Sequence, residues 1–249
     1  MESTNVNYKS MSVKMQRLFM IIVAIMMALV TFTACDEDDE NDGDEGNGSG
    51  VSVSGKRIKS REQTTGPIGD GPVRADENYN SDGTPKRTDW YDAQSKPAGY
   101  DIFTCNPDGT VSKTESYNSS NELTQVTNFS YDSNNKLLKA QGISYFGSIE
   151  NPFTYDYTYQ NGKIIRMVVK MVGVEIVFEY NYDSNGRRTS MTQSNSDGII
   201  IQYTYTYRSD GTLHKVTYPY GYNGNTEITW EYTWENGKTK GNYGDIFSF

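Results

Sequence analysis

The chain has 249 residues, is 35% hydrophobic and 13% aromatic, and contains 20 tyrosines, a composition that favours β-strands with a core built largely from rings. Its net charge of -9 argues against nucleic acid as a partner, because phosphate binding needs a clustered excess of Lys and Arg. The acids are unevenly placed: residues 36–45 hold eight acids and no base, whereas residues 51–249 hold 23 acids and 20 bases and are nearly neutral.

The first 34 residues have the pattern of a signal peptide. Lys9, Lys14 and Arg17 precede an apolar run over residues 18–32, and small residues come after that run. The run is shorter than the roughly 20 residues that a membrane-spanning helix needs. We therefore predict a cleaved signal peptide over residues 1–34 rather than a retained membrane helix.

The residue directly after the predicted cleavage point is a cysteine. Phe32-Thr33-Ala34-Cys35 resembles the lipobox of bacterial lipoproteins, with Phe32 in place of the usual Leu. The resemblance implies that Cys35 becomes the lipidated N-terminus and anchors the protein in the outer membrane of a Gram-negative bacterium. Acyl chains contribute about 0.8 kcal/mol per buried CH₂, so two or three chains anchor stably.

Residues 35–50 read as a tether. The acidic run 36–45 is followed by Gly46-Asn47-Gly48-Ser49-Gly50, and like charges with glycine keep such a segment solvated. A calcium loop is the alternative, but its twelfth position falls on Ser49, where a bidentate Glu is required. An acidic run after a lipidated Cys resembles the export signal of Bacteroides-group surface lipoproteins, which implies exposure at the cell surface.

From Val51 to the C-terminus the chain is a repeat array. Turn residues recur at intervals of 24 to 28 residues, at Gly55, Gly83, Gly109, Asn135, Gly162, Gly186, Gly211 and Gly237. One hairpin and its connection fit each interval. Residues 51–249 are therefore predicted to form an all-β domain, an up-and-down antiparallel meander that is strongly curved or barrel-like.

Rings alternate with polar residues before these turns. Tyr203, Tyr205 and Tyr207 have the period of two that a strand requires. In hairpins whose loop is one residue shorter, the aromatic residues also lie one residue closer to the turn glycine. The sequence thus preserves one aromatic face. Counting residues from the turn places Tyr205 opposite Lys215. The basic residues that follow the turns are therefore predicted to lie on the same side of the sheet as the aromatic residues. Residues 164–171 and 174–178 are apolar on both sides and are predicted to lie at the centre of the core.

The repeats carry a family resemblance. Units such as Tyr180-Asn181-Tyr182-Asp183-Ser184-Asn185-Gly186-Arg187 resemble the tyrosine-aspartate repeats of bacterial cell-surface proteins. With Cys35 and the acidic tether, the mature chain is similar to a family of uncharacterised Bacteroides-group lipoproteins that have a porin-like fold of antiparallel strands. That resemblance implies a shape and no catalytic residues. Charges on both faces of the strands favour a soluble sheet over an integral membrane barrel.

The sequence offers little catalytic chemistry. His214 is the only histidine, which removes a histidine-based triad and any zinc site that needs two imidazoles. Cys105 has no partner once Cys35 is acylated, and we interpret it as a buried or idle strand cysteine rather than a reactive thiol. We predict no catalytic residue, no metal and no cofactor.

Two functions remain. In the first, the protein is a structural or interaction module of the cell envelope, a non-enzyme whose partners are the membrane, through Cys35, and an envelope protein. In the second, it binds a glycan on exposed rings of the last repeat. The nominated ligand surface comprises Tyr218, Tyr220, Tyr222, Trp230, Tyr232 and Trp234.

Overall fold

The computed structural model describes residues 55–68, 71–220 and 226–240. The predicted signal peptide, Cys35 and the tether lie outside this part. The described residues form fourteen strands. These are β1 (Lys56–Thr65), β2 (Arg74–Tyr79), β3 (Pro85–Tyr91), β4 (Pro97–Cys105), β5 (Val111–Asn118), β6 (Leu123–Tyr131), β7 (Leu137–Phe146), β8 (Ile149–Gln160), β9 (Lys163–Met171), β10 (Val174–Tyr182), β11 (Arg188–Asn195), β12 (Ile200–Tyr207), β13 (Leu213–Tyr220) and β14 (Thr226–Asn236).

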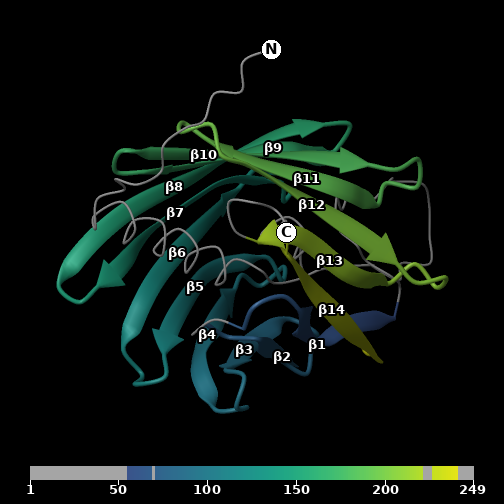
Figure 1. Ribbon diagram of the computed structural model, residues 1–249, viewed down its shortest axis with the longest axis horizontal. Helices are drawn as coiled ribbons and strands as arrows, with labels where there is room; N and C mark the ends of the chain where they lie inside the picture. Colours follow the sequence, from purple (N-terminus) through teal and green to yellow (C-terminus); the bar gives the residue numbers. More distant parts are fainter. Residues whose placement is uncertain (1–54, 69–70, 221–225, 241–249) are drawn as a thin grey trace.

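The strands form one closed barrel. Each pairs antiparallel with its neighbours in sequence, and β14 pairs with β1 to complete the wall (Figure 1). This confirms the predicted all-β, up-and-down meander and shows that the curved sheet closes. Within the described residues no helix occurs, and so none is long or apolar enough to cross a membrane.

The repeated turn residues gather at one end of the barrel, which we call the glycine end. They occupy the turns after the even-numbered strands β2 to β12, while Gly55 precedes β1 and Gly237 comes after β14. The Gly237 N–H donates to the Gly55 carbonyl at 3.0 Å, so the chain enters and leaves the barrel at this end. The turns after the odd-numbered strands form the opposite end, which we call the far end.

The predicted strand register holds for the pair beside the turn, Tyr207 with Leu213, and fails for the pairs beyond it. Tyr205 lies opposite Val216, and Lys215 lies opposite Thr206. The cause is a register shift between Thr206 and Tyr207, because a β-bulge sets an extra residue on one strand and reverses the facing of the residues beyond it. Similar shifts occur near most glycine-end turns, so basic residues that follow these turns, such as Lys215, lie on the outer wall and not among the aromatic side chains. Arg61 and Arg188 are different, because both are buried inside the barrel.

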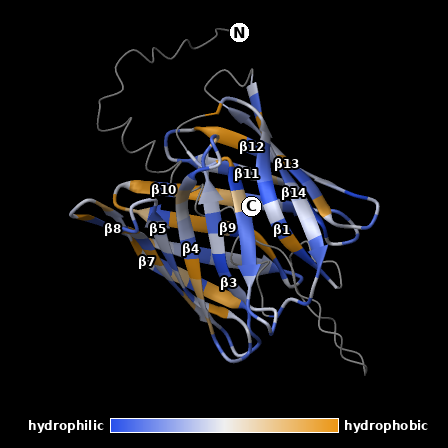
Figure 2. Cartoon of the chain, turned by 90° about the horizontal axis from the view of Figure 1, so that it is seen from below, coloured by the Kyte–Doolittle hydropathy of each residue, from blue (hydrophilic) through white to orange (hydrophobic). Residues whose placement is uncertain are grey.

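The predicted aromatic face is confirmed as the inside of the barrel. Tyr155, Phe178, Tyr180 and Tyr205 are all at least 95% buried, and they pack with aliphatic side chains into one cluster that extends around the wall. Along individual strands hydrophobic and hydrophilic residues alternate, as Figure 2 shows. The strands predicted to form the centre of the core supply several of the most buried aliphatic residues, for example Ile164 at 0% exposure.

A ring of hydroxyl groups ties neighbouring strands together at the glycine end. The last residue on the inner face of an even-numbered strand is usually a tyrosine, and its hydroxyl donates to a carbonyl of the preceding odd-numbered strand. The bonds are Tyr79 to Ile58 (3.0 Å), Tyr131 to Val111 (2.8 Å), Tyr159 to Leu137 (3.0 Å), Tyr182 to Ile164 (2.7 Å) and Tyr207 to Arg188 (2.7 Å). Trp234 makes the same bond through its indole N–H, and Cys105 takes the equivalent place on β4.

We expect Tyr182→Phe to lower the free energy of unfolding by about 1 kcal/mol, because the change removes one hydrogen bond and leaves the ring in place. Urea unfolding of both proteins measures the difference. Tyr145→Phe, on the outer wall, is the control and should change stability by less than about 0.5 kcal/mol. Equal losses for the two variants would show that the hydroxyl ring contributes nothing particular.

Candidate functional site

The rings nominated from the sequence do not form one exposed surface. Trp230 and Tyr232 are 4% and 2% exposed and belong to the core. Trp234 is half-buried and bonded to the Leu213 carbonyl, and Tyr218 packs against Tyr203 with 4.7 Å between ring centroids. Tyr220 is 49% exposed, at the far end, and Tyr222 lies outside the described residues.

The other residues singled out from the sequence have local partners. His214 lies on the outer wall, where its Nε2 is 2.9 Å from Glu231 Oε1. Cys105 is half-buried, and its thiol is 3.8 Å from the Pro85 carbonyl oxygen. Within the described residues no three histidine, cysteine or acidic side chains group together as metal ligands would.

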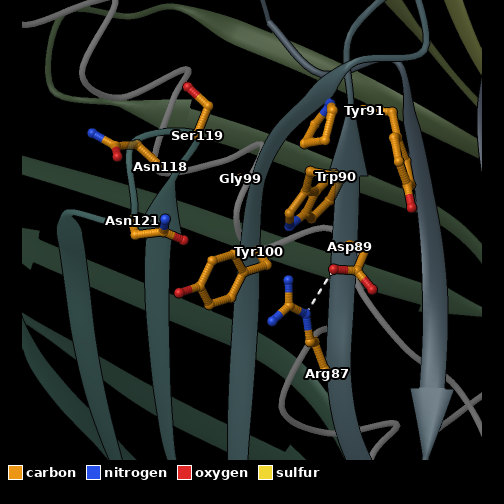
Figure 3. Close-up of a pocket in the computed structure, with 10 residues that line it drawn as sticks. Arg87, Asp89, Trp90, Tyr91, Gly99, Tyr100, Asn118, Ser119 and Asn121 are labelled. Atoms are coloured by element: carbon orange, nitrogen blue, oxygen red, sulfur yellow. Dashed lines mark hydrogen bonds and ion pairs between the residues drawn. The ribbon is translucent and has the colours of Figure 1, made fainter.

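A hollow of about 290 Å³ opens at the far end, beside the β3–β4 and β5–β6 turns. Figure 3 shows Gly99 in its middle, with Trp90 and Tyr91 on one side and Tyr100 and Asn118 on the other. Arg87, Asp89, Pro97, Ser119 and Asn121 complete the lining.

Glycine at position 99 explains why the strands meet so closely here. Gly99 is opposite Trp90 on β3 and Asn118 on β5. A Cβ atom at this position would lie against the backbone carbonyl of Tyr117, so any larger residue would push β4 away from β5. The missing side chain at Gly99 also leaves room between Trp90 and Tyr100. A register shift between Trp90 and Tyr91 interrupts the alternation along β3, and both residues border the hollow on the same side of Gly99 (Figure 3).

The charged groups of the hollow are paired with each other. Arg87 Nε donates to Asp89 Oδ1 at 2.6 Å, and Asn78 Nδ2 donates to Asp89 Oδ2 at 2.9 Å. The Arg87 guanidinium also lies 3.8 Å from the centroid of Tyr100, whose ring stacks on Tyr117 at 4.8 Å. Arg87 and Tyr117 come from the strands on either side of Tyr100, so both faces of that ring are covered.

Trp90 connects the hollow to a buried polar network inside the barrel. Its indole N–H donates to Asp101 Oδ2 at 2.7 Å, and the Arg61 guanidinium lies 4.7 Å from its ring. Arg61 Nη1 is 3.6 Å from Glu77 Oε1, with both side chains fully buried. Thr88 donates to the other Glu77 oxygen at 2.7 Å.

Burial shifts the ionisation of both acids in this network. Loss of solvent raises the pKa of Glu77 to about 8, although the charge of Arg61 and the hydrogen bond from Thr88 oppose the rise. Loss of solvent likewise raises the pKa of Asp101 to about 6, against hydrogen bonds from Ser116 and Trp90. Acids with raised pKa values occur at catalytic sites, but the carboxyl groups of this pair are shut inside the wall.

The sequence carries one local signal for this site. The hollow is assembled from two consecutive hairpins, and none of its residues belongs to a catalytic or ligand-binding motif. Gly99 inside a strand was the available cue, since a strand glycine often marks a bulge or a close backbone approach.

Comparison with known proteins gives structural neighbours only. No protein-family model matches the chain, and no curated protein matches it. A porin-like protein from Bacteroides uniformis superposes with a TM-score of 0.46 at 14% identity, over 72% of this chain and 96% of that one. A porin-like protein from Bacteroides vulgatus gives 0.43 at 10% identity, over 72% and 98%. A Tc holotoxin pore from Photorhabdus luminescens gives 0.27 at 11% identity, over 64% and 12%.

Proposed function

We propose that the protein is a cell-envelope lipoprotein, anchored through Cys35 and exposed at the cell surface, whose barrel has a structural or interaction role without catalysis. The observation that carries the proposal is the placement of the chain ends. Gly55 enters the barrel at the glycine end, so a tether from Cys35 would hold that end near the membrane. The far end would then point outward, toward a partner.

Exposed apolar side chains support an interaction role for the far end. Four aliphatic residues at or beside far-end turns have more than half of their surface exposed: Ile68 at 65%, Ile149 at 62%, Val172 at 72% and Ile200 at 69%. Single exposed apolar residues are ordinary on a protein surface. Four of them on the hairpin tips of one end suggest a docking surface.

Charged residues on the outer wall support the proposal that the barrel lies in water and not in the bilayer. The wall carries ion pairs between strand residues, including Lys170 with Asp156 at 2.8 Å and Lys113 with Glu115 at 2.7 Å. A lipid-facing wall requires a charge-free band of about 25 Å, because a charged side chain at the midplane is destabilising. Anchoring by acyl chains, with the barrel outside the bilayer, fits this distribution.

Glycan binding is the second candidate function. The burial of Trp230 and Tyr232 gives no support for a site on the last repeat. The far-end hollow favours the candidate instead, because it combines aromatic walls with amide and hydroxyl side chains at an open edge.

Removal of the lipidated residue tests the proposal. We expect the wild type to fractionate with membranes and Cys35→Ala to appear in the soluble fraction, since acyl chains would provide the attachment. Cell fractionation followed by a carbonate wash measures this. Cys105→Ala is the matched control and should remain with membranes. Retention of Cys35→Ala in the washed membranes after removal of residues 1–34, checked by mass, would refute lipid anchoring and favour an inserted barrel.

A further inference from the structure

The far-end hollow has the charge balance of a site for an uncharged ligand. Among the described residues that line it, the one cation, Arg87, and the one anion, Asp89, are bonded to each other at 2.6 Å. A phosphate or carboxylate ligand is normally held by an Arg that is free to form two parallel bonds with it. Here Asp89 already occupies Arg87 Nε and would repel a second anion. The remaining lining residues are neutral.

The walls combine flat apolar surface with hydrogen-bonding groups. Arg74 covers one face of Tyr91, with 4.3 Å from its guanidinium to the ring centroid. The other face turns toward Trp90 (Figure 3), and Pro97 is paired with Tyr91 on the neighbouring strand. Both faces of Tyr100 are covered, so a ligand meets its edge and its hydroxyl group. Such a site suits a molecule with apolar C–H surface on one side and polar groups around its rim.

The polar edge is held in position before any ligand arrives. Asn118 Oδ1 accepts the backbone N–H of Ser120 at 2.9 Å and that of Glu122 at 3.0 Å. Asn118 Nδ2 donates to Glu122 Oε2 at 2.8 Å. These bonds fix the β5–β6 turn, on which Ser119 and Asn121 are exposed. Neither of these two side chains hydrogen-bonds to another residue in the described part of the chain, so both remain available.

We propose that the hollow around Gly99 binds an uncharged saccharide. The amide of Asn121 and the hydroxyl of Ser119 would bond to sugar hydroxyl groups, which both donate and accept. The C–H face of the sugar would pack against Tyr91 and Pro97, and the edge and hydroxyl group of Tyr100 would lie beside it. The volume of about 290 Å³ is near the lower bound of roughly 300–1,000 Å³ for small-molecule sites, which suits one or two sugar rings. The proposal extends the interaction role proposed above by assigning a site and a ligand class.

The test is an array of neutral hexose and N-acetylhexosamine oligosaccharides, printed beside sialylated and sulfated ones and probed with the purified full-length protein. We expect binding to neutral glycans. Trp90 lines the hollow, so quenching of tryptophan fluorescence then gives the dissociation constant. Binding to the acidic glycans alone, or to none, would overturn the proposal.

Two matched pairs of variants locate the site. Asn121→Gly removes the amide but keeps a positive φ turn, and should weaken binding about three- to tenfold, as the loss of one hydrogen bond does. Asn135→Gly is its control, because Asn135 has a φ of 58° against 61° for Asn121 and lies in a glycine-end turn. Tyr91→Ala should weaken binding more strongly, and Tyr145→Ala, on the outer wall of β7, should not.

Unchanged affinity in Asn121→Gly and Tyr91→Ala would refute the site even if glycans bind. If Tyr91→Ala fails to fold, Asn121→Gly still decides the question. Both outcomes are independent of the Cys35→Ala fractionation, so failure of the saccharide proposal and failure of lipid anchoring are separate results.

Discussion

The free energy of unfolding should fall as the pH rises from 5 to 9, by a few kcal/mol. The pKa of Glu77 is about 8 in the folded protein against an ordinary value of 4.5. Between these values the folded state holds a proton that the unfolded state has released. The resulting stabilisation is complete below about pH 4.5 and is lost as the pH rises through 8. Each pKa unit corresponds to ~1.4 kcal/mol.

Asp101 contributes to the same pH dependence of the free energy of unfolding, at lower pH. Its pKa rises from 3.8 to about 6, so its contribution is lost as the pH passes 6. The experiment is urea unfolding at pH 5, 6, 7, 8 and 9 for the wild type and Glu77→Gln. The variant cannot ionise at position 77, so its stability should vary much less between pH 6 and pH 9. Glu179→Gln, on the outer wall of β10, is the control and should retain the wild-type slope. A wild-type stability that is flat or rises toward pH 8 would contradict the buried network.

Trp230→Ala should lower the free energy of unfolding by about 3–5 kcal/mol, the range for deletion of a buried large ring. Trp230 is 4% exposed and belongs to the same core cluster as Tyr180, which is 5% exposed. Tyr180→Ala should therefore be equally severe. It has a further cost, since the buried Arg188 guanidinium lies 4.6 Å from the Tyr180 ring and would lose that contact.

Tyr220→Ala is the matched control for these two variants. Tyr220 lies on β13, next to β14, but is 49% exposed at the far end. Its replacement should change stability by less than about 0.5 kcal/mol. Chemical unfolding of the three variants measures all the effects. A mild Trp230→Ala would mean that the last strand is not part of the core and would restore it as a candidate ligand surface.

The repeat pattern predicted the fold because it is a local signal. Each turn residue, such as Gly211, sits a few residues after its rings, so hairpins can be located one at a time. Closure could not be predicted in this way. It depends on β1 meeting β14, and no local pattern in Lys56–Thr65 marks it as the partner of Thr226–Asn236.

The candidate site could not be located from the sequence for a different physical reason. Exposure of a ring depends on which face of a strand it occupies and on what packs over it. Trp230 and Tyr91 are both strand aromatics, yet one is core and the other borders the hollow. The bulges matter equally, because a shift of one residue decided whether Lys215 faced the rings or the solvent. A bulge without a glycine, such as that at Thr206 and Tyr207, leaves no clear mark in the sequence.

The contact between Gly55 and Gly237 makes the order of the strands in the chain largely arbitrary. With the N–H of one glycine 3.0 Å from the carbonyl of the other, a short linker could join the two ends of the barrel, and new termini could be opened at another turn. A permutant opened at Gly147-Ser148, between β7 and β8, would keep every strand pair but begin at the far end. A lipid-anchored tether fused there would invert the barrel relative to the membrane, so that the hydroxyl ring would point outward and the hollow around Gly99 toward the membrane.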